Sequence, residues 1–271
     1  MNSFFSVVIP TLNEEKYIPR LLGDLSKQDF KDFEVVIVDG NSTDKTKDLA
    51  MLYEDKLNLK FYLSNRKNVA AQRNFGSEKS TGKYIIFLDA DARIKHYFLK
   101  RVLKNINKRK GLLFIPFFCP DKGEDEYKPL FDLANVAVEF TNTFKKKFSL
   151  GGSIIAEKNF FELIGGFDEN MYVSEDHELI QRASEWGVAA RFIHDAKVAF
   201  SMRRIRQEGQ LRLFYKYFVS TAHRLFIGEI KDKIYDYKMG GEVYAGDQKQ
   251  KDFNINSYVS EIKKLFNKIL S

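Results

Sequence analysis

Residues 84–91 read Tyr-Ile-Ile-Phe-Leu-Asp-Ala-Asp, an apolar run that ends in two carboxylates one residue apart. A short run of large apolar residues is typical of a strand that is buried on both faces. Asp89 and Asp91 would stand just beyond the end of that strand, where both can face one hard cation, or a cation and a sugar hydroxyl. The triplet alone is weak evidence, because Asp-x-Asp also occurs in solvated turns.

The residues before this run alternate strand and helix patterns, which predicts a mostly parallel sheet with helices on both faces. Ligands collect beyond the carboxyl ends of the strands in such sheets. We therefore expect residues 10–14, Asp39 and residues 89–91 to meet at one edge. The expected strands are residues 5–9, 34–38 and 59–63, and the expected helices contain Ile18 to Leu25, Leu49 with Leu52, and residues 69–79.

The second half of the chain continues the alternation less regularly. A polar stretch at 120–129 is expected to form a loop, and Gly187 is expected to end a helix that begins after Ser174. We predict one α/β domain over residues 1–205 and a basic, aromatic, helical extension over residues 206–271. The other expected elements are helices at 96–108 and around Leu133, Val136, Ala137 and Phe140, and strands at 112–118 and 151–156.

The composition sets limits without selecting a function. The 271 residues include 44 Lys and Arg against 37 Asp and Glu, a formal charge of +7. This charge is compatible with phosphorylated substrates, an anionic membrane surface or nucleic acid. Cys119 is the single cysteine, which excludes an intramolecular disulfide and favours a reducing cytosol. No signal peptide or apolar run of about 20 residues is visible, so we expect a cytoplasmic protein, with the cytoplasmic face of the membrane as an alternative.

Three segments carry a resemblance to a known family. Residues 7–15, 35–46 and 71–91 resemble, in order and spacing, the family 2 glycosyltransferases of the GT-A fold. The resemblance covers roughly residues 4–205, with residues 1–95 on the nucleotide-sugar side and 110–205 on the acceptor side. It implies inverting, Mg²⁺- or Mn²⁺-dependent transfer of a hexose or N-acetylhexosamine from a UDP or GDP sugar to a glycan or lipid-linked acceptor.

The resemblance assigns residues to the donor. Asp39 matches a residue that hydrogen-bonds the base edge, and Glu14 matches one placed for the ribose. Asp91 would be the principal metal ligand, with Asp89 at the metal or ribose. Many relatives carry an aromatic residue where Leu12 stands, so base stacking is weaker here or supplied elsewhere. The remaining matched positions are Pro10, Thr11 and Leu12 in the nucleoside loop, Arg73 and Asn74 near the nucleotide and diphosphate, Ala90 within the triplet, and Arg93 as a weaker phosphate candidate.

The resemblance also assigns an acceptor side. Asp176 matches the general base that takes the acceptor hydroxyl proton, with Glu175 beside it, although carboxylates are favoured in the first turn of any helix. Gly151 and Gly152 match a strand entry beside the acceptor. Relatives often place a histidine after the last core strand, where this chain has Arg203 and Arg204. The resemblance therefore supplies no third protein ligand for the metal: either water completes the shell, or these arginines help to neutralise the diphosphate.

The end of the chain leaves several partners open. Val259, Ile262, Phe266 and Ile269 fall on one stripe of a basic helix, which can lie on an anionic membrane, dock on its own domain or pair with a sister subunit in a homodimer.

Other functions stay as alternatives. A polyprenyl-phosphate sugar synthase would share the fold and the donor, but a phosphate acceptor needs no base at Asp176. A non-catalytic nucleotide-sugar-binding module would not need the full set of carboxylates. Only the net charge suggests a nucleic-acid-binding protein, and no readout motif supports one. A nucleotidyltransferase would need a glycine-rich, basic N-terminal loop that this sequence lacks.

Overall fold

The computed structural model describes residues 3–141, 152–171, 173–200 and 230. Residues 1–169 and 175–201 form one compact unit, and residues 170–174 and 202–271 form a second. Most of the second unit lies outside the described residues, so the predicted boundary at residue 205 and the predicted helical extension stay predictions. In the described part of the chain, no helix is long and apolar enough to cross a membrane.

The described strands of the first unit form one mixed sheet, in the order β3-β2-β1-β4-β7-β6-β8-β5. The pairs β1/β2, β1/β4, β2/β3 and β6/β8 are parallel, and β7 runs antiparallel to both β4 and β6. β5 pairs antiparallel with β8. The strands are β1 (Phe5–Thr11), β2 (Phe33–Asp39), β3 (Leu59–Leu63), β4 (Tyr84–Phe87), β5 (Arg93–Ile94), β6 (Leu113–Pro120), β7 (Ile155–Glu157) and β8 (Arg191–Phe200).

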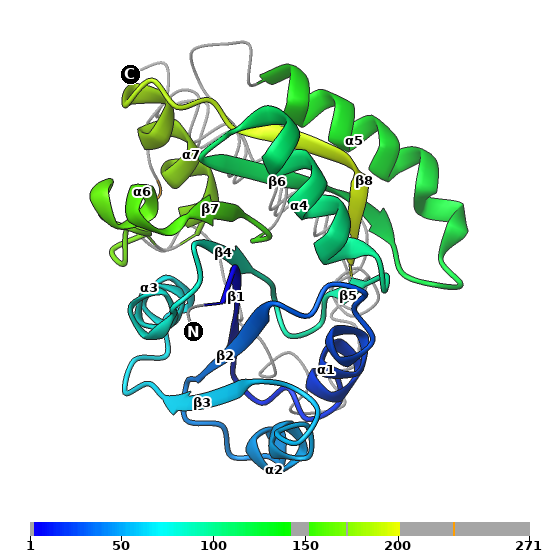
Figure 1. Cartoon of the computed structure of the whole chain (residues 1–271), viewed down its shortest axis with the longest axis vertical. Coiled ribbons are helices and arrows are strands. Elements are labelled where there is room, and N and C mark those ends of the chain that lie inside the picture. Colours follow the sequence, from blue (N-terminus) through cyan, green and yellow to red (C-terminus); the bar gives the residue numbers. More distant parts are fainter. Residues whose placement is uncertain (1–2, 142–151, 172, 201–229, 231–271) are drawn as a thin grey trace, which may run out of the picture. The chain divides into compact units, whose positions relative to one another are not determined.

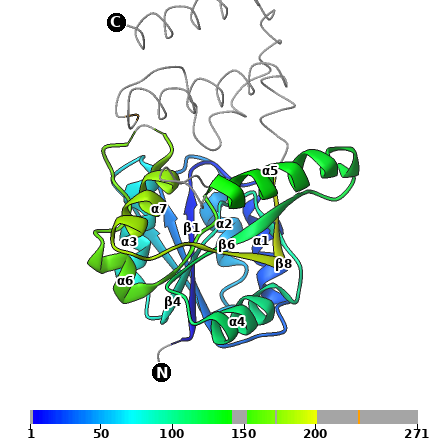
Figure 2. The same cartoon turned by 90° about the horizontal axis from the view of Figure 1, so that it is seen from above.

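Helices cover both faces of the parallel half of the sheet, as predicted. α3 lies against one face of β1 and β2, while α1 and α2 lie together on the other (Figures 1 and 2). The expected apolar residues of α1, Ile18 to Leu25, are buried at helical spacing. The helices are α1 (Ile18–Ser26), α2 (Thr46–Met51), α3 (Val69–Lys79), α4 (Phe98–Arg109), α5 (Lys128–Thr141), α6 (Lys158–Leu163) and α7 (Glu175–Glu185), with a 3-10 turn at Asp125–Tyr127.

The carboxyl ends of β1, β2 and β4 meet at one edge of the sheet. Thr11 pairs with Asp39 across β1 and β2, and the Leu88 amide donates to the Val8 carbonyl at 3.1 Å. β1 continues past its predicted end at Ile9. The Thr11 carbonyl accepts the Gly40 amide at 2.8 Å, which keeps the chain extended through Pro10.

Two other predicted elements differ from the structure in their bounds, the predicted helix at α5 is confirmed, and Leu52, expected in a helix with Leu49, lies just past the end of α2. The strand predicted at residues 151–156 is observed as β7, which covers only residues 155–157, and residues 152–154 are not part of it. The predicted loop at 120–129 contains the 3-10 turn and the start of α5. In α5, Leu133, Val136 and Phe140 form a stripe at helical spacing, but all three side chains are more than half exposed.

Candidate active site

Asp39 is a buried carboxylate that holds the turn after β2. Its Oδ1 accepts hydrogen bonds from Thr11 Oγ1 at 2.8 Å and Ser42 Oγ at 2.6 Å, and its Oδ2 accepts from the Ser42 amide at 2.7 Å. Only 1% of the residue is exposed. The carboxylate therefore shapes the loop 40–42, where Asn41 takes a left-handed φ of 67°. Contact of Asp39 with a base stays a prediction.

The loop after β1 is tied to the loop after β2. The Asn13 amide donates to Ser42 Oγ at 2.7 Å, and the Asn13 side chain accepts from the Thr43 amide at 2.8 Å. The amide of Glu14 donates to Thr46 Oγ1 at 2.7 Å, and Glu14 is buried. The predicted nucleoside residues of β1 and its loop, namely Pro10, Thr11, Leu12 and Glu14, thus lie beside Asp39 at the same edge of the sheet.

Gln72 fastens α3 to this edge, a role that the sequence did not predict. Its side-chain amide donates to the Thr11 and Val38 carbonyls, each at 2.9 Å, and the residue is buried. Gly40 lies close by, because a Cβ there would approach Gln72 Nε2 to 3.1 Å. Gln72 stands between Ala71 and Arg73 in the matched segment 71–91, but neither its residue type nor its spacing indicated this role.

Arg73 is a fully buried cation between two carboxylates. Its Nη2 donates to Asp89 Oδ1 and its Nη1 to Glu175 Oε1, both at 2.7 Å, and its side chain is 2% exposed. Burial alone would lower the pKa of Arg73, but the carboxylates of Asp89 and Glu175 raise it above its ordinary value. The guanidinium also lies over the Phe167 ring, 5.3 Å from its centre. Arg73 is therefore a permanent charge inside the protein.

Asn74 holds the turn that leads toward α7. Its Oδ1 accepts from the Phe167 amide at 2.8 Å, and its Nδ2 donates to the Phe167 carbonyl at 2.9 Å and to Glu169 Oε1 at 3.0 Å. Gly166, with φ of 66°, leaves room for this contact, because a Cβ there would lie 2.6 Å from Asn74 Oδ1. Asn74 thus positions the Phe167 ring under Arg73. Any contact with a nucleotide stays a prediction.

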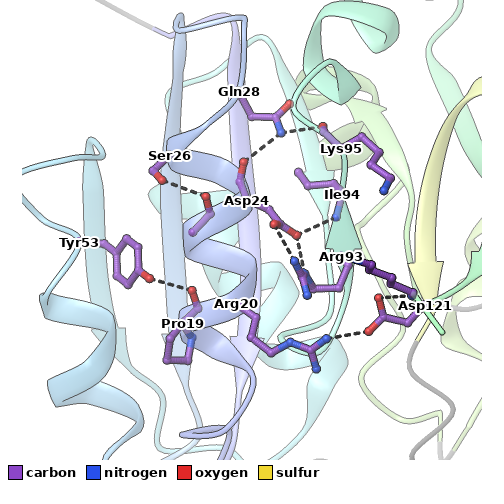
Figure 3. Close-up of polar contacts among 12 residues, drawn as sticks. Pro19, Arg20, Asp24, Ser26, Gln28, Tyr53, Arg93, Ile94, Lys95 and Asp121 are labelled. Carbon is purple, nitrogen blue, oxygen red and sulfur yellow. Dashed lines mark hydrogen bonds and ion pairs between the residues drawn. The ribbon is translucent and has the colours of Figure 1, made fainter.

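The triplet after β4 presents its two carboxylates differently. Asp89 is 38% exposed in its side chain although its Oδ1 is engaged by Arg73. Asp91 is half-buried, and Ala90 between them is buried. Arg93 is held by Asp24 of α1, which accepts hydrogen bonds from Arg93 Nε at 2.6 Å and Nη2 at 3.0 Å (Figure 3). The figure also shows Arg20 of α1 donating to Asp121 at 2.7 Å, which ties α1 to the loop after β6.

Asp89 and Asp91 are the residues that would hold a divalent metal in the triplet. Among residues 3–141, 152–171 and 173–200, no group of three or more His, Cys, Asp or Glu side chains could hold a metal. Mg²⁺ commonly takes one or two carboxylates and completes its shell with water and substrate phosphates. Asp89 and Asp91 fit that mode, since they supply two hard oxygen ligands at the sheet edge.

The predicted acceptor-side residues Glu175 and Gly152 lie beside Arg73. Glu175 and Asp176 open α7, and Asp176 is 7% exposed. Burial raises the pKa of Glu175 above its ordinary value; Arg73 opposes the rise, and the nearby Asp176 carboxylate adds to it. Gly152 borders the cluster, because a Cβ there would lie 1.9 Å from Arg73 Nη2 and 3.2 Å from Asp89 Oδ1. The other predicted residues of this side, Gly151, Arg203 and Arg204, lie outside the described residues.

The mixed sheet and its flanking helices have the GT-A fold, which solved structures of glycosyltransferases share. A structure of Staphylococcus aureus TarS residues 1–349 with UDP-GlcNAc superposes with a TM-score of 0.61 at 23% identity, covering 84% of this chain and 67% of that one. The mannosyltransferase PcManGT from Pyrobaculum calidifontis, with GDP-Man and Mn²⁺, gives a TM-score of 0.63 at 20% identity, covering 83% and 63%.

The chain belongs to Glycosyl transferase family 2, whose sequence profile matches residues 6–162. This confirms the resemblance seen in the sequence. The poly(ribitol-phosphate) beta-N-acetylglucosaminyltransferase TarS of S. aureus strain Mu50 is 43% identical over 100 residues, which cover 35% of this chain but only 18% of TarS. The GalNAc(5)-diNAcBac-PP-undecaprenol beta-1,3-glucosyltransferase of Campylobacter jejuni is 26% identical over 243 residues, or 83% of this chain and 72% of that protein.

Proposed function

We propose that this protein transfers a sugar from a nucleoside diphosphate to an acceptor hydroxyl, with inversion at the anomeric carbon. The observation that carries the proposal is the cluster at the sheet edge. Asp89 of the triplet and Glu175 of the acceptor-side pair both accept hydrogen bonds from Arg73. The two carboxylate motifs therefore lie on either side of one guanidinium group. A transferase needs its leaving-group site and its base this close together.

Asp176 is the residue that we assign as general base. It would take the proton of the acceptor hydroxyl as that oxygen attacks the anomeric carbon from the face opposite the diphosphate. The bond from the anomeric carbon to the diphosphate oxygen breaks, and its electron pair leaves with the diphosphate. Glu175 stands next to Asp176, and its carboxylate is fixed by Arg73. This arrangement favours a hydroxyl acceptor over the phosphate of a polyprenyl-phosphate sugar synthase, since a phosphate oxygen carries no proton to remove.

Asp89 and Asp91 would hold Mg²⁺ or Mn²⁺ together with the diphosphate. When bound, the metal supplies positive charge that stabilises the leaving diphosphate. The loops after β1 and β2 would hold the nucleoside, with Glu14 toward the ribose and Asp39 toward the base. Structural neighbours with UDP-GlcNAc and with GDP-Man support a UDP or GDP sugar as the donor.

The acceptor is proposed to be a glycan or a lipid-linked glycan. The C. jejuni relative, which aligns over most of its own length, is named for a polyprenyl-diphosphate-linked acceptor. A lipid-linked acceptor would bring the enzyme to the cytoplasmic face of the membrane as a peripheral protein. Arg203, Arg204 and the basic residues beyond them would then be available for phosphate groups on the donor or the lipid.

Hydrolysis of the donor tests the proposal without knowledge of the acceptor. Purified protein is mixed with UDP and GDP sugars, with and without Mn²⁺, and thermal shift and released nucleoside diphosphate are measured. We expect either the UDP sugar or the GDP sugar to raise the melting temperature when Mn²⁺ is present, and that sugar nucleotide to be hydrolysed slowly to its nucleoside diphosphate. A chain that binds none of these nucleotides contradicts the assignment, and a chain that binds but never releases diphosphate is a binding module.

Asp176→Asn separates catalysis from binding. Because Asn cannot accept the proton, we expect the rate of nucleoside diphosphate release to fall by a factor on the order of 10²–10⁴. The dissociation constant of the nucleoside diphosphate should stay within threefold of the wild-type value. Unchanged turnover in Asp176→Asn would remove Asp176 from the mechanism and favour the synthase alternative.

A further inference from the structure

The bridge formed by Arg73 joins segments that are far apart in the sequence. The guanidinium of Arg73 donates one N–H to Asp89 and another to Glu175, which is 102 residues away in the chain. Both distances are 2.7 Å, which is typical of charge-assisted hydrogen bonds. Asp89 follows the strand that carries the proposed metal site, and Glu175 precedes the proposed base. The single side chain of Arg73 therefore sets how these two motifs lie relative to each other.

The surroundings of Arg73 are built to hold the guanidinium in place. Phe167 lies under it, and Asn74 fixes Phe167 through two hydrogen bonds to its backbone. Gly152 leaves space for Nη2, since any Cβ at that position would overlap it at 1.9 Å. The Nε of Arg73 is buried and finds no hydrogen-bond partner within the described part of the chain. A buried donor without a partner lowers the stability of the folded protein, so the bridge is kept despite this loss of stability.

Arg73 is also poorly placed to bind a substrate directly. Its side chain is 2% exposed, and both of its Nη atoms are engaged by carboxylates that belong to the protein. Asp89, by contrast, is 38% exposed. A ligand at the sheet edge would therefore meet Asp89, and Arg73 would act through it.

We propose that Arg73 is a positioning residue that locks the Asp89 loop to the start of α7, so that the metal-binding carboxylates and the base are set in one geometry for transfer. The proposal rests on the proposed function for its catalytic consequence. Arginine is suited to this role because its planar fork can serve two carboxylates at once, whereas lysine is a point charge.

Two pairs of variants test the bridge, with three measurements on each protein. Arg73→Met, Glu175→Gln and their double variant form one cycle. Lys60→Met, Glu34→Gln and their double variant form a matched cycle at the ion pair between half-exposed Lys60 and buried Glu34, near the amino end of β2. The measurements are the melting temperature, the dissociation constant of UDP or GDP with Mn²⁺, and the rate of donor hydrolysis.

We expect Arg73→Met to lower the hydrolysis rate at least a hundredfold while the nucleoside diphosphate binds within threefold of the wild type. In the double variant, the loss of rate should be no larger than that of the worse single variant, because residues in one network are not additive. The Lys60 and Glu34 variants should lower the melting temperature and leave the rate unchanged. A tenfold loss of nucleotide affinity in Arg73→Met with an unchanged rate would instead make Arg73 a direct phosphate ligand and overturn the proposal.

Gly152→Ala and Arg73→Lys keep the proposal testable if Arg73→Met does not fold. Both retain the positive charge, but the first displaces Nη2 from Asp89 and the second cannot span the two carboxylates. Each variant should lower the rate of donor hydrolysis at least tenfold. Because water is the acceptor in this assay, the rate does not depend on how a sugar acceptor enters the site. Wild-type rates in both variants would refute the positioning role. If the wild-type protein binds no nucleotide, the proposed function is refuted. The bridge is then tested by stability alone. It is refuted if the falls in melting temperature of Arg73→Met and Glu175→Gln add up to the fall in the double variant.

Discussion

Asp89 and Asp91 are two residues apart, but the surroundings of their side chains differ. Asp89 has one oxygen committed to Arg73, so its position follows the core of the protein. Asp91 is half-buried beyond the strand and follows the buried Ala90. A cation at this edge would meet Asp89 as a fixed ligand. Asp91 would be the principal metal ligand, as the family resemblance implies.

Asp91→Asn should weaken metal-assisted binding of the nucleoside diphosphate. Replacing a carboxylate by a neutral amide weakens a hard-cation site, so we expect the Mn²⁺-dependent gain in nucleoside diphosphate affinity to fall tenfold or more, with metal-free affinity unchanged. Titration calorimetry with and without Mn²⁺ measures both constants. Asp55→Asn, at an exposed position after α2, is the control. Equal metal-dependent gains in all three proteins would place the metal elsewhere.

At the scale of elements, α3 connects the parts of the site. Three consecutive side chains, Gln72, Arg73 and Asn74, reach the ends of β1 and β2, the triplet after β4, and the turn before α7. This reach requires close packing of the helix on the sheet. Gly76 allows that approach, because a Cβ there would lie 2.4 Å from Val8 Cγ1 and 3.2 Å from Val38 Cγ2.

Gly76→Ala should destabilise the protein although alanine is the better helix former. The higher helix propensity of alanine favours folding by about 1 kcal/mol, but overpacking against β1 costs about 1–3 kcal/mol. Gly23→Ala in α1 is the matched control, since its Cβ would meet only Tyr53 Oη at an ordinary 3.5 Å. Urea unfolding should show a lower midpoint for Gly76→Ala and an equal or higher one for Gly23→Ala. Gly76→Ala at wild-type stability would show that α3 can move away from β1 without cost.

Local signals predicted the elements of the donor half well, and tertiary contacts explain what they missed. The bounds of α3 match the predicted helix at residues 69–79, and the structure shows that Asn68 caps it, accepting the Ala71 amide at 2.9 Å. The strand at Leu59–Leu63 likewise matched its apolar run. The bridge from Arg73 to Glu175 could not be predicted, because it depends on how segments 102 residues apart fold together and on the space left by Gly152. The triplet and the Glu175–Asp176 pair were recognisable as motifs, but not as neighbours.

At the scale of the whole molecule, one buried carboxylate outside the site links stability to pH. Glu34 is 1% exposed in its side chain and accepts hydrogen bonds from Ser6, Thr81 and Lys60 at 2.6–2.8 Å. Burial alone would raise the pKa of Glu34, but the bonds from Lys60, Ser6 and Thr81 lower it from 4.5 to about 2. These contacts join the amino ends of β1, β2 and β3 to the turn before β4.

Because the folded pKa of Glu34 lies below the unfolded value, its contribution to stability is complete above pH 4.5 and is lost as pH falls toward 2. A shift of this size corresponds to about 3 kcal/mol at neutral pH. Glu34→Gln should therefore be less stable than the wild type at pH 7, and the difference in the free energy of unfolding should shrink steadily between pH 4.5 and pH 2. Urea unfolding across that range measures it, with the exposed Glu54→Gln as control. A difference that stays constant down to pH 2 would mean that Glu34 keeps its ordinary pKa in the folded protein, and that packing alone holds the amino ends of these strands together.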